Sequence, residues 1–200
     1  MKSLKDMVVV ISGGTRGIGL AIGERIAADG GKVALLGKTM TPHPVLAGTL
    51  GTAAAAIEAA GGEALPIQTD VRHEDQIAKA VKQVVDKWGR VDMVINNASA
   101  ISLTSTSKTS AKAWDLMHSV NTRGTFLLTQ HCLPHLKASP HAHVLTLSPP
   151  LSMDPKWFAP VRFKFSLIVS RFSSKQKNLI FCSSSMEHIR YRNMACLCCR

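Results

Sequence analysis

The 200-residue sequence predicts a doubly wound α/β fold, in which helices cover both faces of a parallel β-sheet. Two observations carry this prediction. Short, β-branched apolar runs alternate with segments of helical periodicity, and a glycine-rich turn follows the first apolar run directly. Because parallel strands need crossover connections, the alternation indicates right-handed βαβ units. A chain of this length is expected to form one domain.

The predicted elements follow one another along the chain. Residues 7–11 are wholly apolar and mostly β-branched, which is typical of a parallel strand buried on both faces. Isoleucines at positions 18, 22 and 26 then repeat at helical spacing until a glycine pair at 30 and 31. By the same criteria we expect strands at residues 32–36, 64–68, 91–95 and 143–147, helices at 52–60, 74–88 and 111–137, the last interrupted near Pro134, and a loop at 39–51.

The composition changes close to residue 160. Residues 1–160 contain 16 Lys and Arg against 12 Asp and Glu, whereas residues 161–200 contain 8 basic residues and one acid. Four of the five cysteines lie in the last 19 residues, and all 14 glycines lie at or before Gly124. We therefore predict a folded domain at 1–160 and a basic, cysteine-rich, irregular tail at 161–200. The domain is expected to be incomplete, with about five strands and no further C-terminal crossovers.

Several classes of protein are disfavoured by composition. No stretch approaches the roughly 20 apolar residues that span a bilayer, and the first apolar run is shorter than the roughly 7–15 residues of a secretory signal. We therefore expect a soluble intracellular protein without a transmembrane segment. The net charge of +11 belongs largely to the tail, which lacks a groove-reading module, so no nucleic-acid partner is expected.

The glycine-rich turn carries the main functional signal. It consists of Gly13, Gly14, Thr15, Arg16, Gly17, Ile18 and Gly19. Between a strand and a helix, such a turn presents backbone N–H groups at the helix N-terminus, where they and the helix dipole favour a phosphate. Gly13 and Gly17 permit positive φ and close approach of a pyrophosphate, and Gly19 lets the helix pack tightly on the sheet. The turn predicts a nicotinamide dinucleotide site; the alternative is a tight turn without a ligand.

The end of the second predicted strand indicates which dinucleotide is preferred. In NAD-binding sites an acid about 20 residues past the glycines holds the ribose hydroxyls, whereas a basic residue accommodates the 2′-phosphate of NADP. Here Gly37, Lys38 and Thr39 occupy that place, and Arg16 lies inside the glycine turn. NADP is therefore favoured over NAD, although Lys38 could also be an ordinary solvated lysine.

Four motifs in order carry a family resemblance. The glycine turn, Asp70-Val71, residues 96–99 (NNAS) and Val120-Asn121 resemble the motifs of the short-chain dehydrogenase/reductases, and further segments between residues 7 and 160 resemble one member of that family more closely. The resemblance implies a Rossmann-like, NADP-dependent oxidoreductase that acts on a carbonyl or secondary alcohol of a lipid-like substrate. It also suggests a peroxisomal or mitochondrial location, although no C-terminal peroxisomal signal is recognisable.

The resemblance assigns roles to single residues. Asp70, with Val71 beside it, would hydrogen-bond the adenine amino group, and Asn97 and Ala98 would line the cofactor and support the fourth strand. Asn121 would hold a water of the proton relay, the alternative being an amide that bonds nearby backbone.

The resemblance also assigns a catalytic role to one serine. Ser148, at the end of the fifth strand, would orient the carbonyl or hydroxyl of the substrate. Because two prolines follow it, the alternative is ordinary turn chemistry.

The catalytic pair that the family resemblance requires is missing. Members carry a tyrosine as the acid–base group, followed four residues later by a lysine that lowers its pKa. The only tyrosine of this chain is Tyr191, and Ala195 stands four residues beyond it. Lys164, near the expected place of the tyrosine, is no evidence of a substitute base.

Three hypotheses follow for this chain. It is an active NADP-dependent oxidoreductase, a catalytically inactive relative, or a basic interaction module that acts through its tail. We favour the inactive relative, whose exposed sheet edge would permit self-association. Metal binding is not expected, since Cys196, Cys198, Cys199 and His188 fit no standard zinc site.

Overall fold

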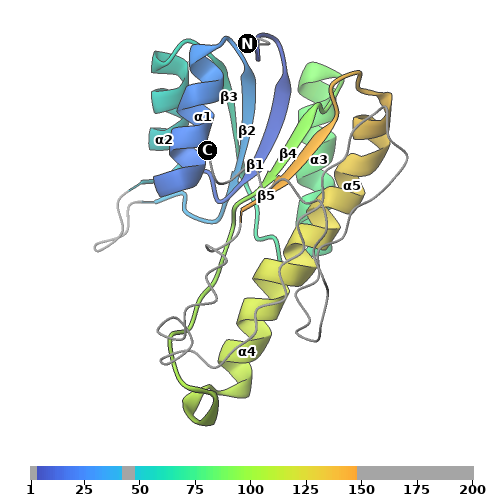
Figure 1. Ribbon diagram of the computed structural model, residues 1–200. Helices are drawn as coiled ribbons and strands as arrows, with labels where there is room; N and C mark the ends of the chain where they lie inside the picture. Colours follow the sequence, from blue (N-terminus) through green and yellow to red (C-terminus); the bar gives the residue numbers. More distant parts are fainter. Residues whose placement is uncertain (1–3, 42–47, 148–200) are drawn as a thin grey trace, which may run out of the picture.

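The computed structural model describes residues 4–41 and 48–147 (Figure 1). Its centre is a parallel sheet of five strands in the order β3-β2-β1-β4-β5. The strands are β1 (Val8–Ser12), β2 (Lys32–Gly37), β3 (Glu63–Gln68), β4 (Met93–Asn96) and β5 (His143–Thr146). The doubly wound α/β fold predicted from the sequence is confirmed.

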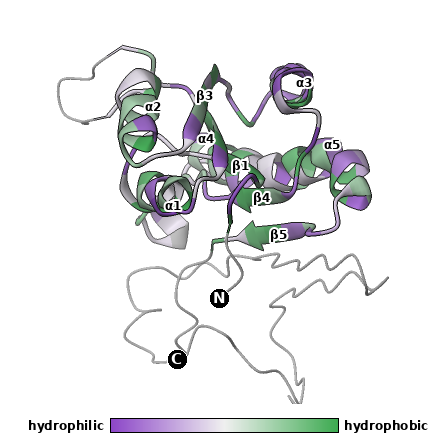
Figure 2. Cartoon of the chain, turned by 90° about the horizontal axis from the view of Figure 1, so that it is seen from above, coloured by the Kyte–Doolittle hydropathy of each residue, from purple (hydrophilic) through white to green (hydrophobic). Residues whose placement is uncertain are grey.

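Helices cover both faces of this sheet. Figure 2 shows α1 (Gly17–Ala28) and α2 (Leu50–Ala59) on one side and α3 (Glu74–Trp88) and α5 (Thr125–Ala138) on the other. α4 (Ala111–His118), preceded by the short 3₁₀ turn η1 (Thr106–Lys108), extends past the carboxyl-terminal edge of the sheet (Figure 1). The π-helical segment η2 (Ser119–Gly124) joins α4 to α5. Within the described part of the chain, no helix is long and apolar enough to cross a membrane.

The continuous apolar run of β1 follows from burial on both faces. Val8 and Val10 pack into the core under α3 and α5, whereas Val9 and Ile11 pack into the core under α1 and α2. All four side chains are at most 1% exposed. A strand with this environment has no solvent side, so its sequence does not alternate.

The structure corrects the predicted interruption near Pro134. α5 continues through this proline, although its ring nitrogen donates no hydrogen bond. Leu128, Cys132 and Leu136 are fully buried on both sides of the proline and hold the helix against the sheet. The irregularity of the predicted long helix lies instead at η2, where a π-helical turn separates α4 from α5.

Two further boundaries differ from the predictions by two residues. α2 begins at Leu50, inside the predicted loop, because Thr49 and Thr52 form a reciprocal capping box at its N-terminus. β4 begins at Met93, two residues later than expected. The preceding residue, Asp92, uses its side chain as well as its backbone to bond β1.

Asp92 connects four elements at the amino-terminal edge of the sheet. Its fully buried carboxylate accepts hydrogen bonds from the backbone N–H of Val8 (2.9 Å) and the hydroxyl of Ser139 (2.5 Å). The guanidinium of Arg90 adds two more, at 2.6 and 3.0 Å. The backbone N–H of Asp92 donates to Val8, and its carbonyl accepts from His143. Through its side chain and its backbone, this one residue thus links the starts of β1, β4 and β5 to the end of α5.

These hydrogen bonds determine the charge of Asp92. Burial raises the pKa of the carboxyl, but hydrogen bonds from Arg90, Ser139 and the Val8 backbone outweigh burial and hold the pKa below its ordinary value. Because the pKa is lower in the folded state, the stabilisation is present above the ordinary pKa and is lost as the pH falls through the folded value. Acid should therefore loosen this edge of the sheet.

Replacing Asp92 by alanine is expected to lower the free energy of unfolding by about 3 kcal/mol, because Val8 and Ser139 would be left with buried, unpaired donors. Urea unfolding followed by circular dichroism measures this change. Asp86→Ala is the control, since it removes the exposed ion pair with Lys82 on α3 and should cost about 0.5 kcal/mol or less. Equal losses in the two variants would contradict the role of Asp92.

Candidate functional site

A cavity of about 490 Å³ opens at the carboxyl-terminal edge of the sheet. Its walls come from the turn after β1, the ends of β2 and β3, and the segment after β4. The chain winds outward from β1 in opposite directions on the two sides of this point, and ligands of open α/β sheets bind at such a switch point. The predicted site residues that line the cavity are Gly13, Thr15, Arg16, Ile18, Lys38, Asp70, Val71, Asn97 and Ala98.

The glycines determine the shape of the turn, although Gly14, Gly17 and Gly19 do not line the cavity. Gly13 and Gly17 have φ angles of +71° and +53°, the left-handed conformations expected for them. The N–H of Gly13 donates to the carbonyl of Leu36 at 2.8 Å, which ties the turn to β2. Arg16 precedes α1, and no side chain caps that helix. The first backbone N–H groups of α1 therefore have no side-chain acceptor, at a helix end that borders the cavity, as a phosphate site requires.

Gly19 permits a closer contact than the one predicted. A Cβ at this position would lie 2.5 Å from the carbonyl oxygen of Gly13 and 2.6 Å from Nδ2 of Asn97. The helix therefore approaches the turn itself and the residue after β4, in addition to the sheet. The contact at Gly14 is of another kind, because a Cβ there would overlap the end of the Leu35 side chain on β2, which can shift. Among these two positions, it is Gly19 whose backbone contact requires glycine.

Ser12 and Asn97 join the glycine turn to the end of β4. The hydroxyl oxygen of Ser12 accepts from the backbone N–H groups of Asn97 and Ala98, both at 3.1 Å. In return, Nδ2 of Asn97 donates to the carbonyls of Ser12 (3.1 Å) and Gly13 (2.8 Å). Ser12 was not among the predicted site residues. Its signal in the sequence is a hydroxyl at the end of an otherwise apolar strand.

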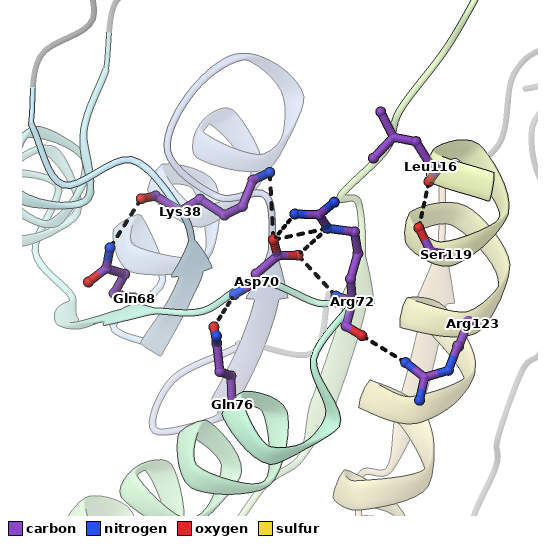
Figure 3. A network of polar contacts seen from close by, with 8 residues as sticks. All are labelled: Lys38, Gln68, Asp70, Arg72, Gln76, Leu116, Ser119 and Arg123. Atoms are coloured by element: carbon purple, nitrogen blue, oxygen red, sulfur yellow. Dashed lines mark hydrogen bonds and ion pairs between the residues drawn. The ribbon is translucent and has the colours of Figure 1, made fainter. Parts of the chain in front are cut away.

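Asp70 lies at the centre of a polar network on the opposite wall (Figure 3). Its two carboxylate oxygens accept three hydrogen bonds from the guanidinium of Arg72, at 2.6 to 3.0 Å, and one from the Arg72 backbone N–H at 3.0 Å. The N–H of Asp70 donates to Gln76 on α3 at 2.8 Å. Nζ of Lys38 lies 3.8 Å from the carboxylate.

The environment of Asp70 keeps it ionised. Burial raises the pKa of this carboxyl. Hydrogen bonds from Arg72 and the positive charges of Lys38 and Arg72 outweigh burial and lower the pKa to about 2. Arg16 joins Lys38 as a second cation of the cavity lining and donates to the hydroxyl of Thr39 at 3.2 Å. The wall near the end of β2 is therefore cationic, with one fixed carboxylate.

The π-helical segment η2 contacts both walls of the cavity. Asn121 forms two hydrogen bonds with the backbone of Ala100, one as acceptor from its N–H and one as donor to its carbonyl, each at 2.8 Å. Arg123 donates to the carbonyl of Arg72 at 2.7 Å. Gly124 lies so close to Val71 that a Cβ would come within 2.9 Å of its side chain. Arg123 and Gly124 were not predicted from the sequence.

Several predicted residues lie outside the described part of the chain. These are Ser148, Lys164, Tyr191 and the cysteines and histidine of the tail. The described residues alone contain no group of three or more His, Cys, Asp or Glu side chains arranged to hold a metal ion. The cysteine among them, Cys132, is buried in the core, and burial raises the pKa of its thiol to about 12.

Comparisons with known proteins match the region that contains the cavity. The family model described as short chain dehydrogenase matches residues 7–159. Hydroxysteroid dehydrogenase-like protein 2 of Xenopus laevis is 52% identical over 155 residues, which cover 78% of this chain and 37% of the relative. The chain thus spans little more than a third of the length of that relative. The resemblances predicted from the sequence motifs are confirmed.

Solved structures share the fold and differ in cofactor. A short chain dehydrogenase from Mycobacterium thermoresistibile is 51% identical with a TM-score of 0.75, covering 79% of this chain and 56% of that one. A metagenomic short-chain oxidoreductase in complex with NADP is 29% identical (TM-score 0.69, 77% and 67% covered). The NADH-dependent reductase A1-R′ complexed with NAD is 23% identical (TM-score 0.63, 72% and 59% covered) and bears on the fold alone.

Gly19→Ala is expected to lower the free energy of unfolding by about 2 kcal/mol, because the added Cβ overlaps Gly13 and Asn97 and the turn must shift. Gly51→Ala is the matched control. Gly51 lies on the exposed side of α2 with only Thr49 Oγ1 nearby, at 3.8 Å from an added Cβ, so this change should stabilise the helix by about 0.5 kcal/mol. Denaturant unfolding measures both variants, and a neutral Gly19→Ala would refute the close contact.

Proposed function

The chain belongs to the short-chain dehydrogenase family, and from this premise we propose that it binds NADP in the cavity at the carboxyl-terminal edge of its sheet. The observation that carries the proposal is the uncapped N-terminus of α1, which a glycine turn opens directly onto the cavity. Backbone N–H groups and the dipole of α1 would hold the pyrophosphate there. The cavity volume lies within the range of about 300–1,000 Å³ that is usual for ligand sites.

The choice of NADP over NAD rests on the charges at the end of β2. Lys38 lies at this point with its side chain 61% exposed, and Arg16 faces it from the glycine turn. Each would approach a 2′-phosphate by giving up one polar contact, that of Lys38 with Asp70 or that of Arg16 with Thr39. Asp70, the carboxylate on the same wall, is already engaged by Arg72 and stands after β3, two strands from β1. It would serve the adenine, with Val71 beside it.

The other wall would hold the nicotinamide half. Asn97 and Ala98 line the cavity there, and Ile18, which is 66% exposed, lines it from the first turn of α1. Asn121 would position this wall through Ala100, to which both ends of its amide are bonded. In the family, the same residue would also serve a proton relay. The bound cofactor would supply or accept a hydride, and the protein would have to handle the proton.

We propose further that this chain binds the cofactor without catalysing turnover. The family resemblance requires a tyrosine with a lysine four residues later, and the single tyrosine, Tyr191, has Ala195 at that position. Asn121 and Ser148 would then form an incomplete catalytic set. The alternative is an active oxidoreductase that acts on a carbonyl or secondary alcohol of a lipid-like substrate, in a peroxisome or mitochondrion, as the resemblance suggests.

Self-association through a sheet edge is a second candidate property. β5 is the terminal strand of the sheet as described, and Leu145 on it is 43% exposed. An exposed strand edge with an apolar side chain favours pairing with another copy. This proposal concerns assembly and is independent of cofactor binding.

Lys38→Ala is expected to weaken NADP⁺ binding about tenfold, through loss of a charge-assisted contact with the 2′-phosphate, and to leave NAD⁺ binding nearly unchanged. Isothermal titration calorimetry with both dinucleotides measures the two affinities. Lys79→Ala removes an exposed lysine of α3 that is paired with Asp75 and serves as the control. Tighter binding of NAD⁺ than of NADP⁺ by the unmodified protein would overturn the proposed preference.

The absence of turnover is tested by following NADPH absorbance in the presence of ketosteroids and other lipid-like carbonyl compounds. We expect no oxidation above a cofactor-only control, because the sequence lacks the tyrosine and lysine pair that would donate the proton in the family. The proposal of an inactive chain fails if a rate above this control is measured and Ser148→Ala abolishes it.

A further inference from the structure

We propose that Arg72 is a positioning residue for nucleotide binding, which holds the carboxylate of Asp70 charged and in one orientation at the cavity wall. The proposal rests on the proposed binding of NADP. Arg72 is not a residue of the cavity lining, and none of the sequence motifs pointed to it. Its role follows from the contacts drawn in Figure 3.

The contacts between the two residues leave the carboxylate of Asp70 little freedom. Oδ1 accepts from the backbone N–H and from Nε of Arg72, both at 3.0 Å. Oδ2 accepts from Nε at 3.0 Å and from a terminal guanidinium nitrogen at 2.6 Å. Charge-assisted bonds to both oxygens fix the plane of a carboxylate as well as its position. A rotation of the Asp70 side chain would break several of them together.

Arg72 is itself held in place from a distant part of the chain. Arg123 of η2 donates to its carbonyl oxygen at 2.7 Å and lies 3.7 Å from Glu74 on α3. Gln76 accepts from the backbone N–H of Asp70 at 2.8 Å. Hydrogen bonds therefore hold the backbone of both Asp70 and Arg72 in place. The side chain of Arg72 extends to the carboxylate from a fixed backbone position.

This arrangement leaves Lys38 available for the ligand. Its ammonium lies 3.8 Å from Asp70, farther away than any nitrogen that Arg72 uses, and its side chain is 61% exposed. If Lys38 turned toward a 2′-phosphate, Asp70 would keep its main cationic partner. One cation would thus hold the carboxylate for the adenine, and another would be released to the phosphate.

The electrostatic consequence is that the affinity for NADP⁺ should become more dependent on pH when the Arg72 side chain is replaced. The charged groups that act on Asp70, among the described residues, are Arg72 from the turn after β3 and Lys38 from the end of β2. Arg123 and Glu74 contact the turn but not the carboxylate. Because burial raises the pKa of Asp70, losing the guanidinium hydrogen bonds of Arg72 should raise it from about 2 toward its ordinary value, while the backbone N–H of Arg72 and the charge of Lys38 continue to lower it.

The experiment compares NADP⁺ binding by calorimetry from about pH 7 to about pH 4 in the unmodified chain and in Arg72→Gln. The quantity of interest is the ratio of the two dissociation constants at each pH, since titration of the ligand itself cancels in this ratio. We expect Arg72→Gln to bind about fivefold more weakly at neutral pH. The ratio should then grow roughly threefold further as Asp70 is protonated in the variant.

Three further variants assign the effect. Arg25→Gln removes a comparable arginine paired with Asp29 at the end of α1, outside the cavity, and should behave as the unmodified chain. Arg72→Lys keeps the charge and should show a nearly constant ratio with intermediate affinity. In the Asp70→Asn background, Arg72→Gln should add no dependence on pH. Thermal unfolding verifies that each protein is folded at every pH used.

The possible failures are distinguishable. If the unmodified chain does not bind NADP⁺, the proposed function is wrong. If it binds and the ratio for folded Arg72→Gln stays constant down to about pH 4, the positioning role of Arg72 is overturned, whatever the affinity at neutral pH. A growing ratio that persists in the Asp70→Asn background would also overturn it, because the titrating group would then be another residue.

Discussion

The buried carboxylate of Asp92 is the interaction on which the alignment of the sheet depends. It receives donors from the start of β1, from Arg90 before β4 and from Ser139 after α5, while its backbone bonds β1 and β5. A buried charge with this many partners tolerates little displacement, since any lost donor leaves an uncompensated charge in the core. The first residues of the three strands therefore lie side by side. Because the strands are parallel and in register, their carboxyl ends are aligned as well.

The candidate site inherits this alignment. β1 and β4 end side by side, with Ser12 opposite Asn96, so that the hydroxyl of Ser12 meets the backbone after β4 and the amide of Asn97 meets the glycine turn. The segment η2 then fixes the outer walls through Asn121 and Arg123. The cavity is thus bounded by backbone that is hydrogen-bonded from several directions. Preorganisation of this kind lowers the entropic cost of binding a long, flexible ligand.

The charges at the site are divided between a fixed part and a movable part. Asp70 is held by short bonds from Arg72, whereas Lys38 is exposed and more loosely paired. An anionic ligand would benefit from the movable cation and from the uncapped N-terminus of α1, without disturbing the fixed carboxylate. The family to which the chain belongs uses such a cavity for nicotinamide dinucleotides, and the charge pattern here is the basis for preferring NADP.

The local order of residues was sufficient to predict the α/β class, the strands and the glycine-turn side of the cavity, because buried strands and glycine turns have local signatures. The family resemblance supplied Asp70, Val71, Asn97 and Ala98 of the lining. The partners of Ser12 and Arg123 could not be found in this way, since they lie far away in the sequence. Arg72 is only two residues from Asp70, but no motif of the sequence singled it out. The same applies to Pro134, where burial of α5 outweighed a local helix-breaking preference. The sequence by itself determined which elements form and which residues lie in the glycine turn. Only the tertiary structure decided which distant side chains hold the glycine turn in place. Those contacts arise from packing between elements, so they produce no periodic pattern in the sequence.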